Sequence, residues 1–103
     1  MRGKKPYTYR IGWSELGLYY YGVRTANRLP PEDDLWTEYF TSSPNVEVVR
    51  EHHGEPDIIE VRRTFDLKRR AQYWESEVIR RIAYYNPSYL NGVNSKILAE
   101  SFS

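Results

Sequence analysis

Two short runs rich in aromatic residues, joined by a turn, constrain this chain more than any other feature. Residues 6–13 (PYTYRIGW) place an aromatic or aliphatic side chain at every second position, which is the periodicity of a half-buried strand. Residues 18–24 (LYYYGVR) are rich in aromatic residues that favour strands. The intervening SELG holds turn residues and ends in glycine, so the two runs are expected to form a β-hairpin.

The hairpin predicts which side chains share a face. With a loop of about two or four residues, the side chains on one face are Tyr7, Tyr9, Tyr20 and Arg24. Gly22 then lies opposite Tyr9 and leaves space there, while Tyr19 and Tyr21 point to the other face. This face suits three roles: a packed core, a platform for stacking nucleic-acid bases, or a phosphate site made of phenols and a guanidinium.

The remaining pattern predicts one small α+β domain over residues 1–103, with a three-stranded antiparallel sheet flanked by helices. The expected order is β-β-α-α-β-α with a short C-terminal helix. After the hairpin, the expected elements are a short helix near 34–40, a helix from Pro44 to before Gly54 with Ser43 as its N-cap, a strand over 57–65, a long helix from Asp66 to Asn86-Pro87, and a short helix in 94–103. Alternation in the third strand places Ile59, Val61 and Phe65 on one face.

The long helix after the third strand carries a carboxylate at the edge of its apolar face. The apolar positions, spaced by three or four residues, are Leu67, Ala71, Trp74, Val78, Ile82 and Tyr85. At about 100° per residue, Glu75 lies beside this face, whereas Glu77 projects roughly opposite. A carboxylate there is costly unless it is paired or metal-bound. Glu75 is therefore expected either to pair with an arginine or to be the single carboxylate ligand of Mg²⁺ or Mn²⁺.

The overall charge and composition exclude some classes of site and leave others open. The net charge of +1 is no sign of a nucleic-acid binder, although residues 61–81 hold seven Lys and Arg. We interpret the runs 68–70 and 80–81 as solvated faces, with DNA-backbone binding as the alternative. The absence of cysteine excludes disulfides and thiolate zinc sites. No apolar run approaches the length of a membrane span and no signal peptide is visible, so no membrane association is expected.

These residues together resemble the GIY-YIG nuclease family. Tyr7-Thr8-Tyr9 corresponds to the family's first triplet and Tyr20-Tyr21-Gly22 to its second. A glutamate on the last main helix and an asparagine soon after it follow in the family's order, at Glu75 and Asn91. The stretch 39–43 (YFTSS) resembles small phage-type members, and the likeness covers roughly residues 6–92.

The resemblance implies a metal-dependent DNA endonuclease that hydrolyses phosphodiester bonds with one Mg²⁺ or Mn²⁺ ion. Tyr9 would be a general base or would position water, and Tyr20 would orient water or phosphate. Glu75 would bind the metal and Asn91 would support the site. The family arginine corresponds first to Arg24 and second to Arg28.

The resemblance also implies DNA as the partner and a cytoplasmic location, in the host cell if a phage encodes the protein. Larger members carry a separate DNA-binding domain, for which 103 residues leave no room. Weak non-specific binding, a homodimer or a targeting partner protein would then select the target. Two alternatives stay open: a catalytically silent nucleic-acid-binding module on the same scaffold, and a structural or protein-interaction domain with the aromatic residues as its core.

Overall fold

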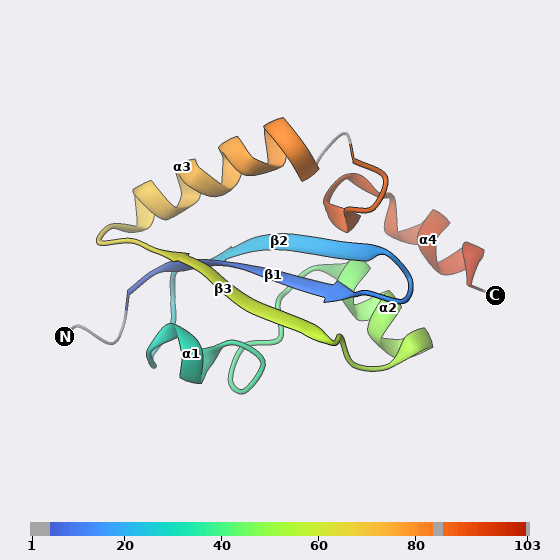
Figure 1. The fold of residues 1–103 in the computed structure, drawn as a ribbon, viewed down its shortest axis with the longest axis horizontal. Helices are drawn as coiled ribbons and strands as arrows, with labels where there is room; N and C mark the ends of the chain where they lie inside the picture. Colours follow the sequence, from blue (N-terminus) through green and yellow to red (C-terminus); the bar gives the residue numbers. More distant parts are fainter. Residues whose placement is uncertain (1–4, 84–85, 103) are drawn as a thin grey trace.

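The structure, a computed structural model, describes residues 5–83 and 86–102 (Figure 1). Within them one antiparallel sheet of order β2-β1-β3 is flanked by four α-helices, which confirms the predicted α+β fold. The strands are β1 (Tyr7–Trp13), β2 (Leu18–Arg24) and β3 (Ile58–Thr64). The α-helices are α1 (Pro31–Asp34), α2 (Pro44–His53), α3 (Lys68–Val78) and α4 (Ser95–Ser101). A π-helical turn, η1 (Ile79–Ala83), and a 3₁₀ turn, η2 (Leu90–Gly92), lie between α3 and α4.

The β1–β2 hairpin has the predicted register. Tyr9 lies opposite Gly22 and Ile11 lies opposite Tyr20. The strands are joined through residues 14–17, where Gly17 adopts a φ of 64° that suits glycine. Because this loop has an even length, the alternation of the two strands stays in phase and their predicted faces are preserved.

The helices cover the sheet from opposite sides. Figure 1 shows α3 running along one face, with α1 and α2 below the other. The buried core that includes the tyrosine face of β1 consists of Tyr7, Tyr9, Ile11, Trp13, Leu35, Val46, Val49, Leu90 and Leu98. The sheet therefore has a well-buried face on the side of α1 and α2.

A bulge in β3 overturns one predicted face. Ile59 and Val61 pair with Ile11 and Tyr9, but the register then shifts so that Arg63 pairs with Thr8. The extra residue reverses the alternation, and the ring of Phe65 lies 6.4 Å from that of Trp74 on α3. The prediction that Phe65 shares a face with Ile59 and Val61 is therefore wrong.

The helix boundaries are correct for α2 and α4 and wrong for α1. Ser43 caps α2 by accepting the Val46 N–H at 3.4 Å, and Gly54 follows its last residue. The predicted C-terminal helix is α4, capped by Asn94. Instead of a helix over 34–40, α1 begins at Pro31 and ends at Asp34, since Trp36 adopts a left-handed φ of 63° that no α-helix accommodates.

The long helix differs from its prediction in its start, in its change to a π-helical turn and in its packing. Asp66 is not the N-cap: it forms an ion pair with Lys5 at 3.4 Å, and Leu67 occupies the cap position. The helix is α-helical to Val78 and continues as η1. Ala71 is buried, whereas Leu67 and Ile82 are 41% and 53% exposed, so the predicted apolar face is only partly covered. The predicted position Tyr85 lies outside the described residues.

Candidate active site

A cluster of phenols and hydroxyls forms where β1 and β2 meet the segment before α2. The ring centroid of Tyr9 lies 6.2 Å from that of Tyr20 and 5.8 Å from that of Tyr39. The Tyr9 hydroxyl donates a hydrogen bond of 2.8 Å to Thr41 Oγ1. Tyr9 is 1% exposed, while Tyr20 is half-buried. The structure thus confirms that Tyr9 and Tyr20 are neighbours, and it leaves Tyr20 the more accessible of the two.

Gly22 makes room for this cluster, but the space beside it is occupied. A Cβ built at Gly22 would lie 2.9 Å from Cε2 of Tyr20 and would clash with the hydroxyl end of Tyr9. The Tyr9 ring therefore extends across β2 where a side chain would otherwise stand. The sequence predicted open space opposite Tyr9, and the structure corrects this: Tyr9 itself fills it.

Both tyrosines are held in their neutral form. Burial raises the pKa of the Tyr9 phenol far above its usual value, and the neighbouring Tyr20 and Tyr39 phenols raise it further. Burial also raises the pKa of Tyr20, and the next largest cause is the negative charge of Glu75. At neutral pH these hydroxyls can orient water or phosphate oxygens through hydrogen bonds. They are poorly suited to act as phenolate bases.

Glu75 on α3 is electrostatically coupled to this cluster, since its charge raises the pKa of Tyr20. It is half-buried, and burial raises the pKa of its own carboxyl group. Among the described residues Glu75 has no ion pair, whereas Glu77 pairs with Arg80 at 3.1 Å and Arg81 at 3.5 Å. The arginine partner considered for Glu75 is therefore not found in the described part of the chain.

The donor set around Glu75 fits only a weakly held cation. No group of three or more His, Asp or Glu side chains in residues 5–83 and 86–102 is arranged to hold a metal ion. Glu75 would be the one carboxylate ligand, and water and substrate phosphate would complete the shell. Mg²⁺ is commonly bound in this way, with one or two carboxylates and several retained waters. A half-buried carboxylate without an ion pair among the described residues fits such a role.

Arg24 lies beside the tyrosine cluster, and its charge is balanced there. Its guanidinium pairs with Asp34 at 3.1 Å and lies 4.3 Å from the ring centroid of Tyr39. Asp34 is 1% exposed and also accepts a 2.7 Å hydrogen bond from the Tyr7 hydroxyl. The predicted position of Arg24 on the tyrosine face is confirmed. Its buried carboxylate partner, Asp34 at the end of α1, was missed, because sequence spacing does not show which helix residue reaches a strand.

Arg28, the second candidate arginine, lines the same pocket as Arg24. This pocket has a volume of about 450 Å³ and also includes Asp34 and Glu38. Arg28 is exposed, and among the described residues it has no carboxylate within ion-pair distance. The two alternatives for the family arginine are thus brought together, with Arg24 bound to Asp34 and Arg28 open to solvent.

Asn91 supports the site through the backbone. Its side chain accepts a hydrogen bond of 3.0 Å from the Tyr21 N–H and donates one of 2.7 Å to the Tyr21 carbonyl. These bonds fasten η2 to β2 immediately beside Tyr20. Because the amide is engaged at both ends, we expect Asn91 to position Tyr20 without contacting a substrate.

Thr41 is a central residue of the cluster that the sequence reasoning did not identify as a site residue. It has a φ of 64°, which is unfavourable for a β-branched side chain, and strained residues of this kind concentrate at functional sites. Its hydroxyl accepts hydrogen bonds from Tyr9 and, at 3.3 Å, from the Ser43 N–H. The only sequence signal was its place in the YFTSS stretch, since a positive φ cannot be read from residue type here.

Comparison of the chain with known protein families, with curated proteins and with solved structures finds no match. In the described ranges, 5–83 and 86–102, no helix combines the length and apolar character needed to cross a bilayer.

Proposed function

We propose that the protein is a metal-dependent DNA endonuclease that hydrolyses phosphodiester bonds by a GIY-YIG-like one-metal mechanism. The observation that carries this proposal is the coupling of Glu75, a half-buried carboxylate without an ion pair among the described residues, to Tyr20. Tyr9 lies next to Tyr20, and Glu75 is on α3, which packs against β2, so that its charge reaches Tyr20. The order of these residues along the chain resembles that of the family motifs.

In this proposal Glu75 would hold a divalent cation, which would supply stabilisation of the negative charge that develops on the scissile phosphate. The half-buried Tyr20 hydroxyl orients the attacking water for in-line displacement. Tyr9 fixes the position of Tyr20, because its own hydroxyl is committed to Thr41 and its ring lies against the Tyr20 ring. The raised pKa of Tyr9 supports positioning over proton abstraction, so bulk water or a phosphate oxygen accepts the proton.

A guanidinium is needed to neutralise the phosphoryl charge, and Arg28 is the better placed donor. Arg24 already shares its charge with the buried Asp34. Arg28 lines the same pocket and is exposed. We therefore assign phosphate binding to Arg28, because arginine can bind two phosphate oxygens at once. Arg24, which is bound to Asp34 and lies against the Tyr39 ring, holds the wall of the pocket in place.

A plasmid-nicking assay with Mg²⁺ or Mn²⁺ tests the proposal. We expect the wild-type protein to convert supercoiled plasmid to nicked or linear DNA, and Glu75→Gln and Tyr20→Phe each to lose about 100-fold or more in rate. Glu77→Gln is the matched control, since Glu77 lies on the same helix and pairs with surface arginines. No cleavage by the wild-type protein, or full activity in Glu75→Gln, contradicts the proposal.

The second candidate function is a nucleic-acid-binding module without activity. The near-complete burial of Tyr9 and the ion pair of Arg24 favour it, because neither group is then free to contact a substrate. DNA binding by the wild-type protein without cleavage, unchanged in Glu75→Gln, would support this candidate over the endonuclease.

A further inference from the structure

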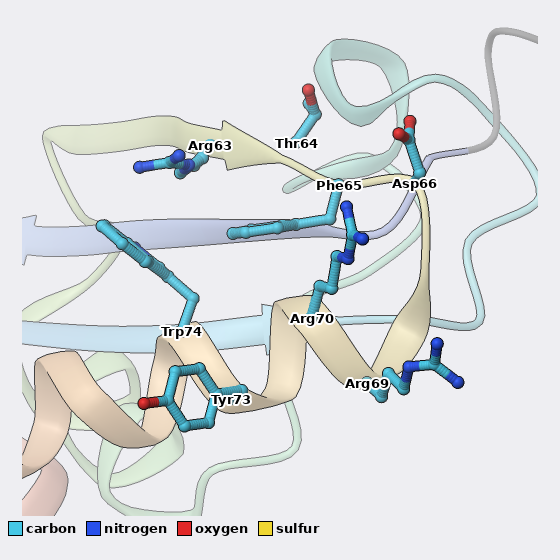
Figure 2. A pocket seen from close by; sticks show the side chains of 8 residues that line it. All are labelled: Arg63, Thr64, Phe65, Asp66, Arg69, Arg70, Tyr73 and Trp74. Carbon is cyan, nitrogen blue, oxygen red and sulfur yellow. The ribbon is translucent and has the colours of Figure 1, made fainter.

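A groove of about 640 Å³ lies on the α3 side of the sheet, where β3 leads into α3 (Figure 2). Its arginine and aromatic side chains are Arg63, Phe65, Arg69, Arg70, Tyr73 and Trp74. Arg63 pairs with Thr8, whose side chain points away from the face that carries Tyr9. The groove is therefore separate from the tyrosine cluster, and its volume lies in the range of ligand-binding pockets.

The groove carries positive charge that no described carboxylate balances. Arg63, Arg69 and Arg70 have no ion pair among the described residues, and the one acid in the lining, Asp66, pairs with Lys5. The neighbouring Arg62, by contrast, has its charge balanced by an ion pair with Glu60 at 3.1 Å. An anionic partner is thus favoured at this groove.

The aromatic residues give the groove a second property, flat surfaces beside the charges. The guanidinium of Arg63 lies 4.1 Å from the Trp74 ring centroid and 5.7 Å from that of Phe65. Figure 2 shows Arg63 and Phe65 on the β3 side facing Trp74 and Arg70 from α3. Stacking on rings orients a guanidinium and leaves its N–H edge free for phosphate. Tyr73 is 67% exposed, so its ring is open to a ligand.

We propose that this groove binds a single strand of nucleic acid, with one base stacked on Tyr73 and backbone phosphates on Arg63, Arg69 and Arg70. Exposed aromatic rings next to unpaired arginines are the arrangement that binds unstacked bases together with their backbone. In a duplex the faces of the bases are hidden, and an acidic peptide or a lipid headgroup would use the charges but not the ring. The inference goes beyond the proposed hydrolysis, since binding here requires neither a metal nor Glu75.

Fluorescence anisotropy of the full chain with a fluorescein-labelled oligothymidylate of about twelve nucleotides tests this assignment. The measurement is made in EDTA and repeated from about 50 mM to about 200 mM salt. We expect Tyr73→Ala to weaken binding about tenfold. Tyr73→Phe, which keeps the ring, should bind like the wild type.

The arginines are tested by salt dependence. Removing Arg69 and Arg70 together should reduce the slope of log affinity against log salt by about 1.4, or about 0.7 for each lost phosphate contact with a single strand. The matched control removes Arg80 and Arg81, which carry the same charge just beyond α3 and pair with Glu77. Circular dichroism melts establish that each variant is folded.

Three results would overturn the assignment: unchanged affinity in folded Tyr73→Ala, equal affinity for a duplex of the same length, or an equal loss in the Arg80 and Arg81 control. The variant Glu75→Gln separates a failure of the proposed hydrolysis from a failure of the proposed strand binding. This variant should lose cleavage and keep oligothymidylate binding. A wild-type protein that binds the strand and does not cleave DNA refutes the endonuclease and supports the groove.

Discussion

The two faces of the sheet differ in how far their covering elements bury the side chains. On the side of α1 and α2, Tyr7, Tyr9 and Ile11 are buried, and the polar atoms of the tyrosines are hydrogen-bonded. On the side of α3, the helix buries Ala71 and leaves Tyr73 exposed. The first face supplies the apolar burial that stabilises a small domain. The second face is free to present arginines and rings to a partner.

The same contrast governs charge. Asp34 is buried on the tyrosine face, where Arg24 and the Tyr7 hydroxyl bind it. On the α3 side, Glu60 pairs with Arg10 and Arg62 near solvent. A buried pair is costly to break because the remaining charge has no water, whereas an exposed pair is readily replaced by solvent. This difference can be measured by comparing substitutions on the two faces.

The largest expected effect is that of Asp34→Ala. It removes the carboxylate partner of Arg24 and leaves the buried Tyr7 hydroxyl unpaired, so the free energy of unfolding should fall by about 3–5 kcal/mol. Glu60→Ala, the control on the other face, should cost about 1 kcal/mol or less. Urea unfolding followed by tryptophan fluorescence measures both. Equal losses in the two variants would remove the distinction between the faces.

The next largest effect is the loss of stability when either of two hairpin glycines is replaced by alanine. Gly22→Ala places a methyl group against the buried ring of Tyr9, so it should cost about 1–3 kcal/mol by overpacking. Gly12→Ala meets the ring of Tyr19 at 2.5 Å, but this ring is half-buried and can rotate away, so its cost should be smaller. Thermal melts rank the two. A larger loss for Gly12→Ala would show that the α3 side is the more tightly packed.

The smallest effect concerns pH and Glu75. Burial raises the pKa of this carboxyl in the folded chain above its ordinary value of 4.5. At pH values between the ordinary pKa and the raised pKa of the folded chain, the folded state binds more protons than the unfolded state. The free energy of unfolding therefore falls as pH rises through this window. Glu75→Gln should remove this dependence and be more stable than the wild type at neutral pH.

Glu77→Gln is the control for that experiment. Its ion pair with Arg80 lowers the pKa of Glu77, so this carboxylate stabilises the fold above its ordinary pKa and the contribution is lost as pH falls. Urea unfolding at several values from about pH 4 to about pH 7 separates the two variants. If Glu75→Gln is no more stable than the wild type at neutral pH, Glu75 is not desolvated and the argument for its role weakens.

Parts of the site followed from local pattern, and parts did not. The adjacency of Tyr9 and Tyr20 was predicted because strand alternation and an even loop length determine which side chains share a face. The placement of Asp34 and Thr41 was not, because both lie outside regular alternation. The predicted cap of α3 was wrong: Leu67 occupies the cap position, and Asp66 pairs with Lys5, which is distant in sequence.

Local sequence was enough for the hairpin register, the α2 caps and the pairing of Gly22 with Tyr9, since each depends on residues close along the chain or on one short turn. The position of the arginine and aromatic side chains in the groove was decided by the tertiary structure. One extra residue in β3 reverses its alternation and brings Arg63 and Phe65 to the side of Trp74. A bulge forms against the partner strand, so its position reflects contacts between residues far apart in sequence, which periodicity within one strand does not contain.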